Sequence, residues 1–201
     1  MVRLLFTVIF FIVLGSPSYS VPSCPKNKSI KSWHNCFGEE KNFLDDSFYR
    51  GFWRNGKRNG QGTEAHQNGT LYVGNWKNGK ADGLGALTLN HQSLDIINSG
   101  KLRYQGEFKD NAFDGYGTLF WETDKYLNWQ KGSKYVGFWK NGNRSGSGIY
   151  TWSWNENNNR TRNLRYEGEW KNDKKNGKGT LIFDNGAGYD GNWVDDLKHG
   201  E

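Results

Sequence analysis

Apolar and polar residues alternate along most of this chain, and one alternating pattern returns six times. Each copy reads Tyr-x-Gly-x-Trp, with Phe108 in the tryptophan place of the third copy. The copies begin at Tyr49, Tyr72, Tyr104, Tyr135, Tyr166 and Tyr189. Because side chains alternate between the two faces of a strand, the Tyr, Gly and Trp of a copy share one face. The pattern predicts six equivalent β-strands that build a common aromatic face.

A turn and a Gly-x-Gly follow each of the first five copies, which predicts the second strand of a hairpin. The pairs are Gly60 and Gly62, Gly83 and Gly85, Gly115 and Gly117, Gly146 and Gly148, and Gly177 and Gly179. We expect both glycines of a pair to lie on the aromatic face, where a missing Cβ lets a ring lie flat on the backbone. The first repeat departs from the pattern, since Glu64 and His66 follow its glycines where other repeats have apolar residues.

Asn-Gly pairs such as Asn55-Gly56 and Asn78-Gly79 are typical of tight hairpin turns. The expected fold is an antiparallel meander of about eleven strands, two for each of five complete repeats and one for the sixth. The sixth repeat ends at Glu201 and is expected to lack its second strand. Hydrophobic residues make up 34% of the chain and aromatic residues 16%. This composition favours one thin, elongated sheet over a globule with a thick core.

The full pattern Tyr-x-Gly-x-Trp-x-x-Gly-x-x-x-Gly-x-Gly resembles the MORN repeat (membrane occupation and recognition nexus), from Tyr49 to Gly200. The segment from Trp33 to Gly38 resembles the half-repeat that opens small exported bacterial MORN proteins. The resemblance implies an all-β fold: an elongated, twisted, single-layer antiparallel meander of tandem β-hairpin repeats over residues 49–201. It also implies a role in binding or scaffolding, because these repeats are not known as catalytic modules.

The spacing of the repeats is uneven. Tyr49 and Tyr72 are 23 residues apart, whereas Tyr72 and Tyr104 are 32 apart, and the next two intervals are similarly long. The additional residues fall in segments 90–103, 121–134 and 152–165, which must leave one edge of the meander side by side. Insertions on one side of a repeat protein often build its binding surface. The candidate partner-binding residues are Trp121, Tyr126, Trp129, Trp152, Trp154, Arg160 and Arg162. Alternatively, the insertions lengthen three hairpins and widen the core.

A trough lined by rings and edged by arginines suits a protein partner first, and also a polysaccharide. The formal net charge is +6, and loss of Arg3 with a leader would lower it by one to +5. Basic residues are distributed over the repeat turns. They keep an open sheet soluble, or they give it an affinity for an anionic membrane surface. They do not gather into a stripe, and together with export this argues against nucleic acid.

The sequence shows no catalytic constellation, and we expect neither enzymatic activity nor a cofactor. The histidines His34, His66, His91 and His199 lack the spacing of metal ligands. No nucleophile motif or phosphate-binding loop is present. Adjacent carboxylates point to opposite faces of a strand and make poor acid–base partners. The weakest alternative is a hydrolase of cell-wall glycans that uses Glu122 and Glu156 across the aromatic trough.

Residues 1–20 read as a secretory signal peptide. Arg3 provides the positive charge, an unbroken apolar run extends from Leu4 to Leu14, and cleavage is expected after Ser20. The run is too short to cross about 30 Å of hydrocarbon as a helix. The sequence therefore predicts a secreted or periplasmic protein.

Export favours a disulfide between Cys24 and Cys36 in the lead-in segment 21–48, because both cysteines would lie in an oxidising compartment. Lipid attachment at Cys24 is the alternative. Pro22 and the distance from the apolar run weigh against it.

Overall fold

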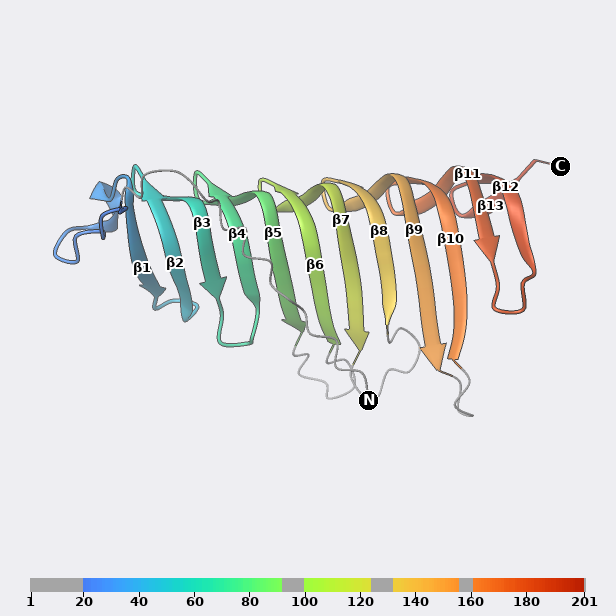
Figure 1. The fold of residues 1–201 in the computed structure, drawn as a ribbon, viewed down its shortest axis with the longest axis horizontal. Helices are drawn as coiled ribbons and strands as arrows, with labels where there is room; N and C mark the ends of the chain where they lie inside the picture. The colour runs from blue at the N-terminus through green and yellow to red at the C-terminus, as the bar shows by residue number, and fades with distance from the viewer. Residues whose placement is uncertain (1–19, 92–99, 124–131, 156–160, 201) are drawn as a thin grey trace.

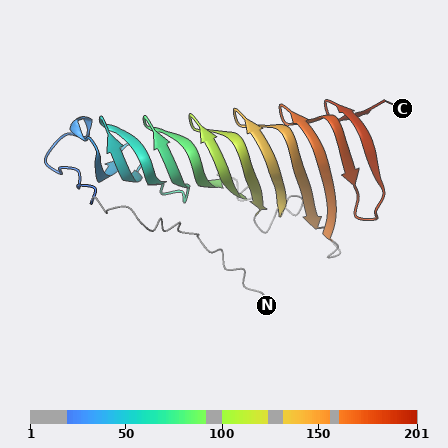
Figure 2. The ribbon, with the colours of Figure 1, turned by 45° about the horizontal axis from the view of Figure 1, so that its top comes forward.

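The computed structural model describes residues 20–91, 100–123, 132–155 and 161–200, which form one antiparallel sheet of thirteen strands. Each strand pairs with its neighbours in the sequence, so the order across the sheet is β1 to β13 (Figure 1). A short 3₁₀ turn, η1 (Ile30–Ser32), precedes β1, and the described residues form no α-helix. The sheet is a single elongated, twisted layer, as two views of the ribbon show (Figures 1 and 2).

The strands are β1 (Cys36–Asn42), β2 (Ser47–Arg54), β3 (Lys57–Ala65), β4 (Leu71–Lys77), β5 (Lys80–His91), β6 (Gly100–Lys109), β7 (Ala112–Thr123), β8 (Ser133–Lys140), β9 (Asn143–Asn155), β10 (Thr161–Lys171), β11 (Lys174–Ile182), β12 (Gly188–Val194) and β13 (Leu197–His199). The single-layer meander is confirmed, but the expected number of strands is wrong. The lead-in forms β1, and the sixth repeat has a second strand after all.

The additional strand β13 is short, and its turn explains why it forms. Asp195 and Asp196 adopt φ values of 49° and 73°, which reverse the chain. The reversed chain pairs Trp193 with Lys198 and Val194 with Leu197. Turn geometry therefore starts the second strand before any Gly-x-Gly is reached, so the spacing of glycine pairs does not predict it.

Tight turns of one kind close the six repeats. Both central residues have positive φ in Asn55-Gly56, Asn78-Gly79, Asp110-Asn111, Asn141-Gly142, Asn172-Asp173 and Asp195-Asp196. Two such residues define a type I′ turn, whose twist matches that of the strands. The turns also bind the preceding hairpin: Asp173 N–H donates to the Arg144 carbonyl (3.2 Å), and Asp173 Oδ1 accepts from Arg144 N–H (2.9 Å). Asp or Asn at the second turn position thus joins successive repeats.

The two glycines of each pair have different roles. A Cβ built on Gly148 would lie 2.3 Å from Tyr135 Oη, so the tyrosine ring lies on the bare backbone as expected. Gly146, in contrast, has a φ of 69°, and its Cβ would face Phe138 on the opposite side of the sheet. The strands carry a β-bulge here, which requires the left-handed conformation that glycine adopts without strain. The expected placement under a ring is correct for the second glycine and wrong for the first.

The core of the sheet is a continuous ladder of aromatic rings. Successive edge-to-face contacts, with centroids 4.9 to 5.7 Å apart, join Trp33, Trp53, Tyr49, Trp76, Tyr72, Phe108, Tyr104, Trp139, Tyr135, Trp170, Tyr166, Trp193 and Tyr189. The polar ring atoms are satisfied by backbone: Tyr135 Oη donates to the Phe138 carbonyl (2.9 Å), and Trp170 Nε1 donates to the Gly148 carbonyl (3.2 Å). Edge-to-face pairs are favourable beyond their burial, so this ring ladder takes the place of a second layer.

The lead-in closes the first edge of the sheet. Cys24 and Cys36 form the expected disulfide, with their Cα atoms 4.9 Å apart. Cys24 N–H donates to the Phe37 carbonyl (2.8 Å), and Phe37 N–H donates to the Pro22 carbonyl (2.9 Å). The segment before β1 therefore covers part of its outer edge. Trp33 starts the ring ladder by its contact with Trp53.

Replacing a ladder ring by alanine should destabilise the protein far more than replacing an adjacent turn residue. Trp170→Ala removes three ring contacts and a buried hydrogen bond, and we expect a loss of about 3–5 kcal/mol. Lys171, the next residue, is exposed. Lys171→Ala should therefore change the free energy of unfolding by at most about 0.5 kcal/mol. Urea unfolding followed by tryptophan fluorescence measures both. Equal losses would contradict the ring ladder as the core.

Candidate binding surfaces

The aromatic face is closed by the protein's own side chains. One residue shortly after each turn lies over the rings, and the series is Arg58, Ala81, Phe113, Arg144, Lys175 and Lys198. The Arg144 guanidinium lies 4.3 Å from the Trp170 ring centroid, and Phe113 stacks on Tyr104 at 3.7 Å. Cations over ring faces are attracted by the ring quadrupole. The ring ladder is consequently covered rather than presented to a partner.

The departure of the first repeat belongs to this cover. Arg58 lies 4.5 Å from the centroid of Tyr49, and its Nη1 atom pairs with Glu64 Oε1 at 2.5 Å. Its Nη2 atom pairs with Glu40 Oε2 at 3.2 Å. His66 Nε2 lies 3.8 Å from the second oxygen of Glu64. Glu64 thus replaces an apolar residue because it neutralises a cation that is held over the rings.

Burial in the ladder shifts the tyrosine pKa values upward. Desolvation raises the pKa of Tyr72 to about 12, and desolvation together with Glu169 raises the pKa of Tyr166 to about 12. The pKa of Tyr135 is raised as well by desolvation, which outweighs the opposing effect of Arg144. Desolvation also lowers the pKa of the Lys175 ammonium, against the opposing charge of Asp196. These shifts follow from packing and do not mark catalytic groups.

The opposite side of the sheet, here called the open face, has no such cover among the described residues. Its central row of register partners is uncharged from β3 to β9: Thr63, Val73, Ala86, Gln105, Thr118, Val136 and Ile149. The same row continues into charged residues at both ends. Arg50 and Glu39 form an ion pair at the first end (3.4 Å), and Glu167 and Asp190 lie in the row near the other. The central row of the open face is therefore a neutral strip between charged ends.

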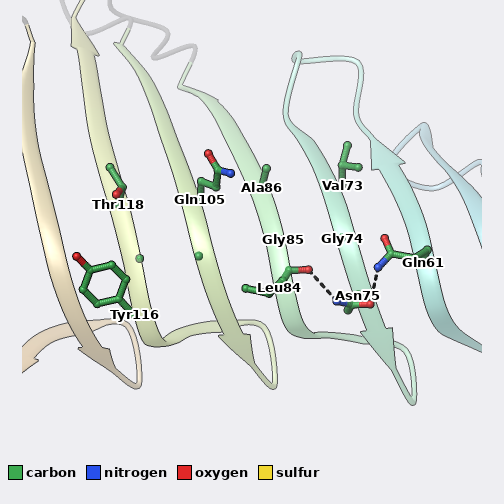
Figure 3. Close-up of a pocket in the computed structure, with 12 residues that line it drawn as sticks. Gln61, Val73, Gly74, Asn75, Leu84, Gly85, Ala86, Gln105, Tyr116 and Thr118 are labelled. Carbon is green, nitrogen blue, oxygen red and sulfur yellow. Dashed lines mark hydrogen bonds between the residues drawn. The ribbon is translucent and has the colours of Figure 1, made fainter. Parts of the chain in front are cut away.

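A shallow groove of about 610 Å³ lies within this strip (Figure 3). Its floor includes the backbone of Gly74, Gly85, Gly106 and Gly117. Leu84, Tyr116 and Val73 are 66%, 50% and 45% exposed there. The Asn75 amide is fixed in position, because it accepts from Gln61 Nε2 (2.6 Å) and donates to the Leu84 carbonyl (3.1 Å). This groove was not predicted from the sequence. Its signal in the sequence is that the groove-lining residues next to these glycines are uncharged.

The sequence-predicted site residues are only partly brought together. Trp152 lies 4.1 Å and Trp121 5.4 Å from the ring centroid of Tyr150, and both tryptophans are half-buried against the ring ladder. These two therefore extend the core. Trp154 in β9 and Arg162 in β10 are register partners.

Tyr126, Trp129 and Arg160 lie outside the described residues, as do the side chains of Trp154 and Arg162. The long strands that carry these residues meet the edge of the sheet opposite the tight turns, as expected (Figure 1). β9 has 13 residues, whereas β3 has 9. A role of this edge in binding stays a prediction.

Within the described residues, no group of three or more His, Cys, Asp or Glu side chains could hold a metal ion. The same part of the chain contains no helix long and apolar enough to cross a membrane. Of the two carboxylates considered for glycan hydrolysis, Glu122 lies in β7 and Glu156 lies outside the described residues.

Comparison with known families agrees with the architecture. The MORN repeat matches residues 49–71, 72–90, 104–124, 135–156, 166–188 and 189–201, which are most of the chain. The protein belongs to the MORN-repeat family. No curated protein matches the chain, so the repeats carry the assignment.

Alkaline pH should unfold the protein in a defined window. The folded-state pKa of Tyr72 and Tyr166 is about 12, above the ordinary value of 10.0. A raised folded pKa gives stability that is complete below the ordinary pKa and is lost as pH rises through the folded pKa. The free energy of unfolding should therefore fall between pH 10 and 12. Urea titrations across this range measure it, and ionisation of Tyr72 and Tyr166 near pH 10 in the folded protein would contradict their burial.

Proposed function

We propose that this protein is a non-enzymatic binding module that holds a protein partner on its open face. The observation that carries the proposal is the groove, where Leu84, Tyr116 and Val73 remain exposed while the other face is closed by its own side chains. Exposed apolar side chains that cluster on a soluble protein mark interaction sites. Repeats of this family are typically non-catalytic binding modules, which supports the same conclusion.

The chemistry of the strip favours a neutral, partly apolar segment of a protein. The central row contains no charged residue from Thr63 to Ile149, so a charged ligand would lose hydration without gaining an ion pair there. Tyr116 and Phe138 form an edge-to-face pair at 5.4 Å and are each about half exposed. Aromatic side chains of this kind are enriched among the residues that dominate protein interfaces.

The groove is also rigid before any partner arrives. Its walls stand on strands rather than on loops, and the Asn75 amide is held by two hydrogen bonds. A surface that is already ordered loses little conformational entropy on binding, which favours affinity. The candidate residues of the long hairpins other than Trp121 and Trp152 remain predicted partner contacts.

Charges placed in the groove should abolish partner binding without unfolding the sheet. We expect Leu84→Lys and Tyr116→Lys to reduce recovery of the partner at least tenfold, since each buries an unpaired ammonium in the interface. Leu197→Lys on β13 is the matched control, because Leu197 is 72% exposed and lies outside the groove. Quantitative mass spectrometry of proteins retained by the immobilised chain measures recovery. Equal recovery with all three variants would refute the proposed surface.

We further propose that the protein is exported, with residues 1–20 removed. The signal-peptide pattern supports this, and so does the buried Cys24–Cys36 disulfide, which suits an oxidising compartment. N-terminal sequencing of the protein recovered outside the cytosol should begin at Val21. Recovery of the full-length chain from the cytosol, with free thiols at Cys24 and Cys36, would refute export.

A further inference from the structure

A row of cations follows the turn edge of the open face. Of the twelve positions that flank the six tight turns, four hold the uncharged residues Ala112, Asn143, Val194 and Leu197. The other eight hold Arg54, Lys57, Lys77, Lys80, Lys109, Lys140, Lys171 and Lys174. These eight residues, here called the basic row, are all exposed. In the sequence they are spread over about 120 residues, from Arg54 to Lys174. In the sheet, the meander places them along one edge.

The basic row contains like charges placed directly opposite each other. Arg54 pairs with Lys57, Lys77 with Lys80, and Lys171 with Lys174 in the strand register. Like charges in directly opposed positions destabilise a hairpin. Solubility alone would be served by any exposed charge, so three repeated like-charge pairs point to an anionic ligand.

Only part of the row is neutralised by the protein itself. Carboxylates pair with Lys80, Lys140 and Lys174, at distances of 3.1, 3.3 and 3.8 Å. Among the described residues, no carboxylate pairs with the remaining five: Arg54, Lys57, Lys77, Lys109 and Lys171. These five cations are available to a ligand.

A polar hollow of about 580 Å³ adjoins the row between the first two turns. Arg54 and Lys77 line it, together with the amides of Asn55, Asn59, Asn75 and Asn78 and one carboxylate, Asp82. Asparagine side chains both donate and accept hydrogen bonds, as hydroxyl groups require. Two cations with four amides therefore match a group that bears many hydroxyls and a negative charge.

We propose that the hollow and the basic row bind a linear acidic polysaccharide, with its carboxylate or sulfate groups along the row. Neighbouring hairpins are two strands apart, so their cations repeat at about 10 Å along the edge. The amides of the hollow bind hydroxyls of one sugar, while Arg54 and Lys77 bind the acidic groups beside it. The hollow adjoins the protein-binding groove and shares Asn75 with it, whereas Arg54 and Lys77 lie outside the groove.

The shape of the charged surface favours a polysaccharide over a membrane. The row is one residue wide, and the open face carries Glu107 and Glu169 one position further inward. The sheet also twists along its length (Figure 2). A flexible chain can follow a curved line of cations, whereas a flat bilayer contacts only part of it.

The hollow also disfavours a nucleic acid. Single-stranded nucleic acids stack their bases on aromatic side chains. Trp76 is the one aromatic residue among those that line the hollow, and its side chain is only 5% exposed. The hollow offers amides for hydroxyls instead of a platform for bases.

The test uses the full chain without residues 1–20, with heparin and polygalacturonate as probes and neutral dextran as the reference polymer. Isothermal titration at several salt concentrations should show binding to both acidic polymers but not to dextran, with an affinity that falls as salt rises. The double variant Arg54→Ser/Lys77→Ser should weaken binding at least tenfold.

The matched control is Lys26→Ser/Lys28→Ser, which removes the same number of charges from exposed positions of the lead-in, outside the row. It should change the affinity less than twofold. Lys77→Ser should also raise the melting temperature slightly, because it relieves a like-charge pair. The groove variant Leu84→Lys should not weaken binding to either polymer, which separates this site from the proposed protein-binding surface.

Three results would overturn the proposal. Equal weakening by both double variants would show that net charge alone drives binding. Tighter binding to phosphatidylserine vesicles than to either polymer would assign the row to a membrane. Tighter binding to single-stranded DNA would assign it to nucleic acid.

Discussion

A tyrosine ring lying on a pair of opposed glycines is the contact on which the rest of this structure depends. Any side chain at the second glycine of a repeat would occupy the place of the ring: a Cβ at Gly148 would meet Tyr135 Oη at 2.3 Å. Because the ring lies that close to the backbone, its hydroxyl reaches the carbonyl three residues ahead. The tryptophan of the next repeat then packs against it edge-to-face. Repetition of this unit produces a core without a second layer.

A core of this kind makes the two faces unequal. The ring ladder and the residues over it, such as Arg144 and Phe113, close one face. The other face keeps its side chains exposed, since nothing in the described chain packs on it. Both proposed sites therefore lie on the open face, the neutral groove in its middle strands and the basic row at its turn edge. The two proposed sites therefore differ in chemistry although they lie on the same face.

The two edge strands of the sheet, β1 and β13, are protected in different ways. At the first end, the disulfide holds Cys24 against the outer edge of β1, and Trp33 provides the ring that a preceding repeat would have supplied. At the other end, β13 follows a turn of two aspartates and carries charged and exposed residues. Exposed edges invite uncontrolled strand pairing, which charges discourage.

The sequence by itself determined the family, the meander and the aromatic face, because each depends on local spacing that repeats along the chain. The disulfide was predicted from the signal-peptide pattern and the two cysteines of the lead-in. Tyr-x-Gly-x-Trp places three residues on one side of a strand wherever the strand lies. Only the tertiary structure decided that Gly146 serves a bulge while Gly148 lies under a ring, and that Trp121 and Trp152 extend the core. It also decided that dispersed cations form a row and that Glu64 neutralises Arg58. These features depend on cross-strand register and on bulges, and such distances are not encoded in the spacing of any one repeat.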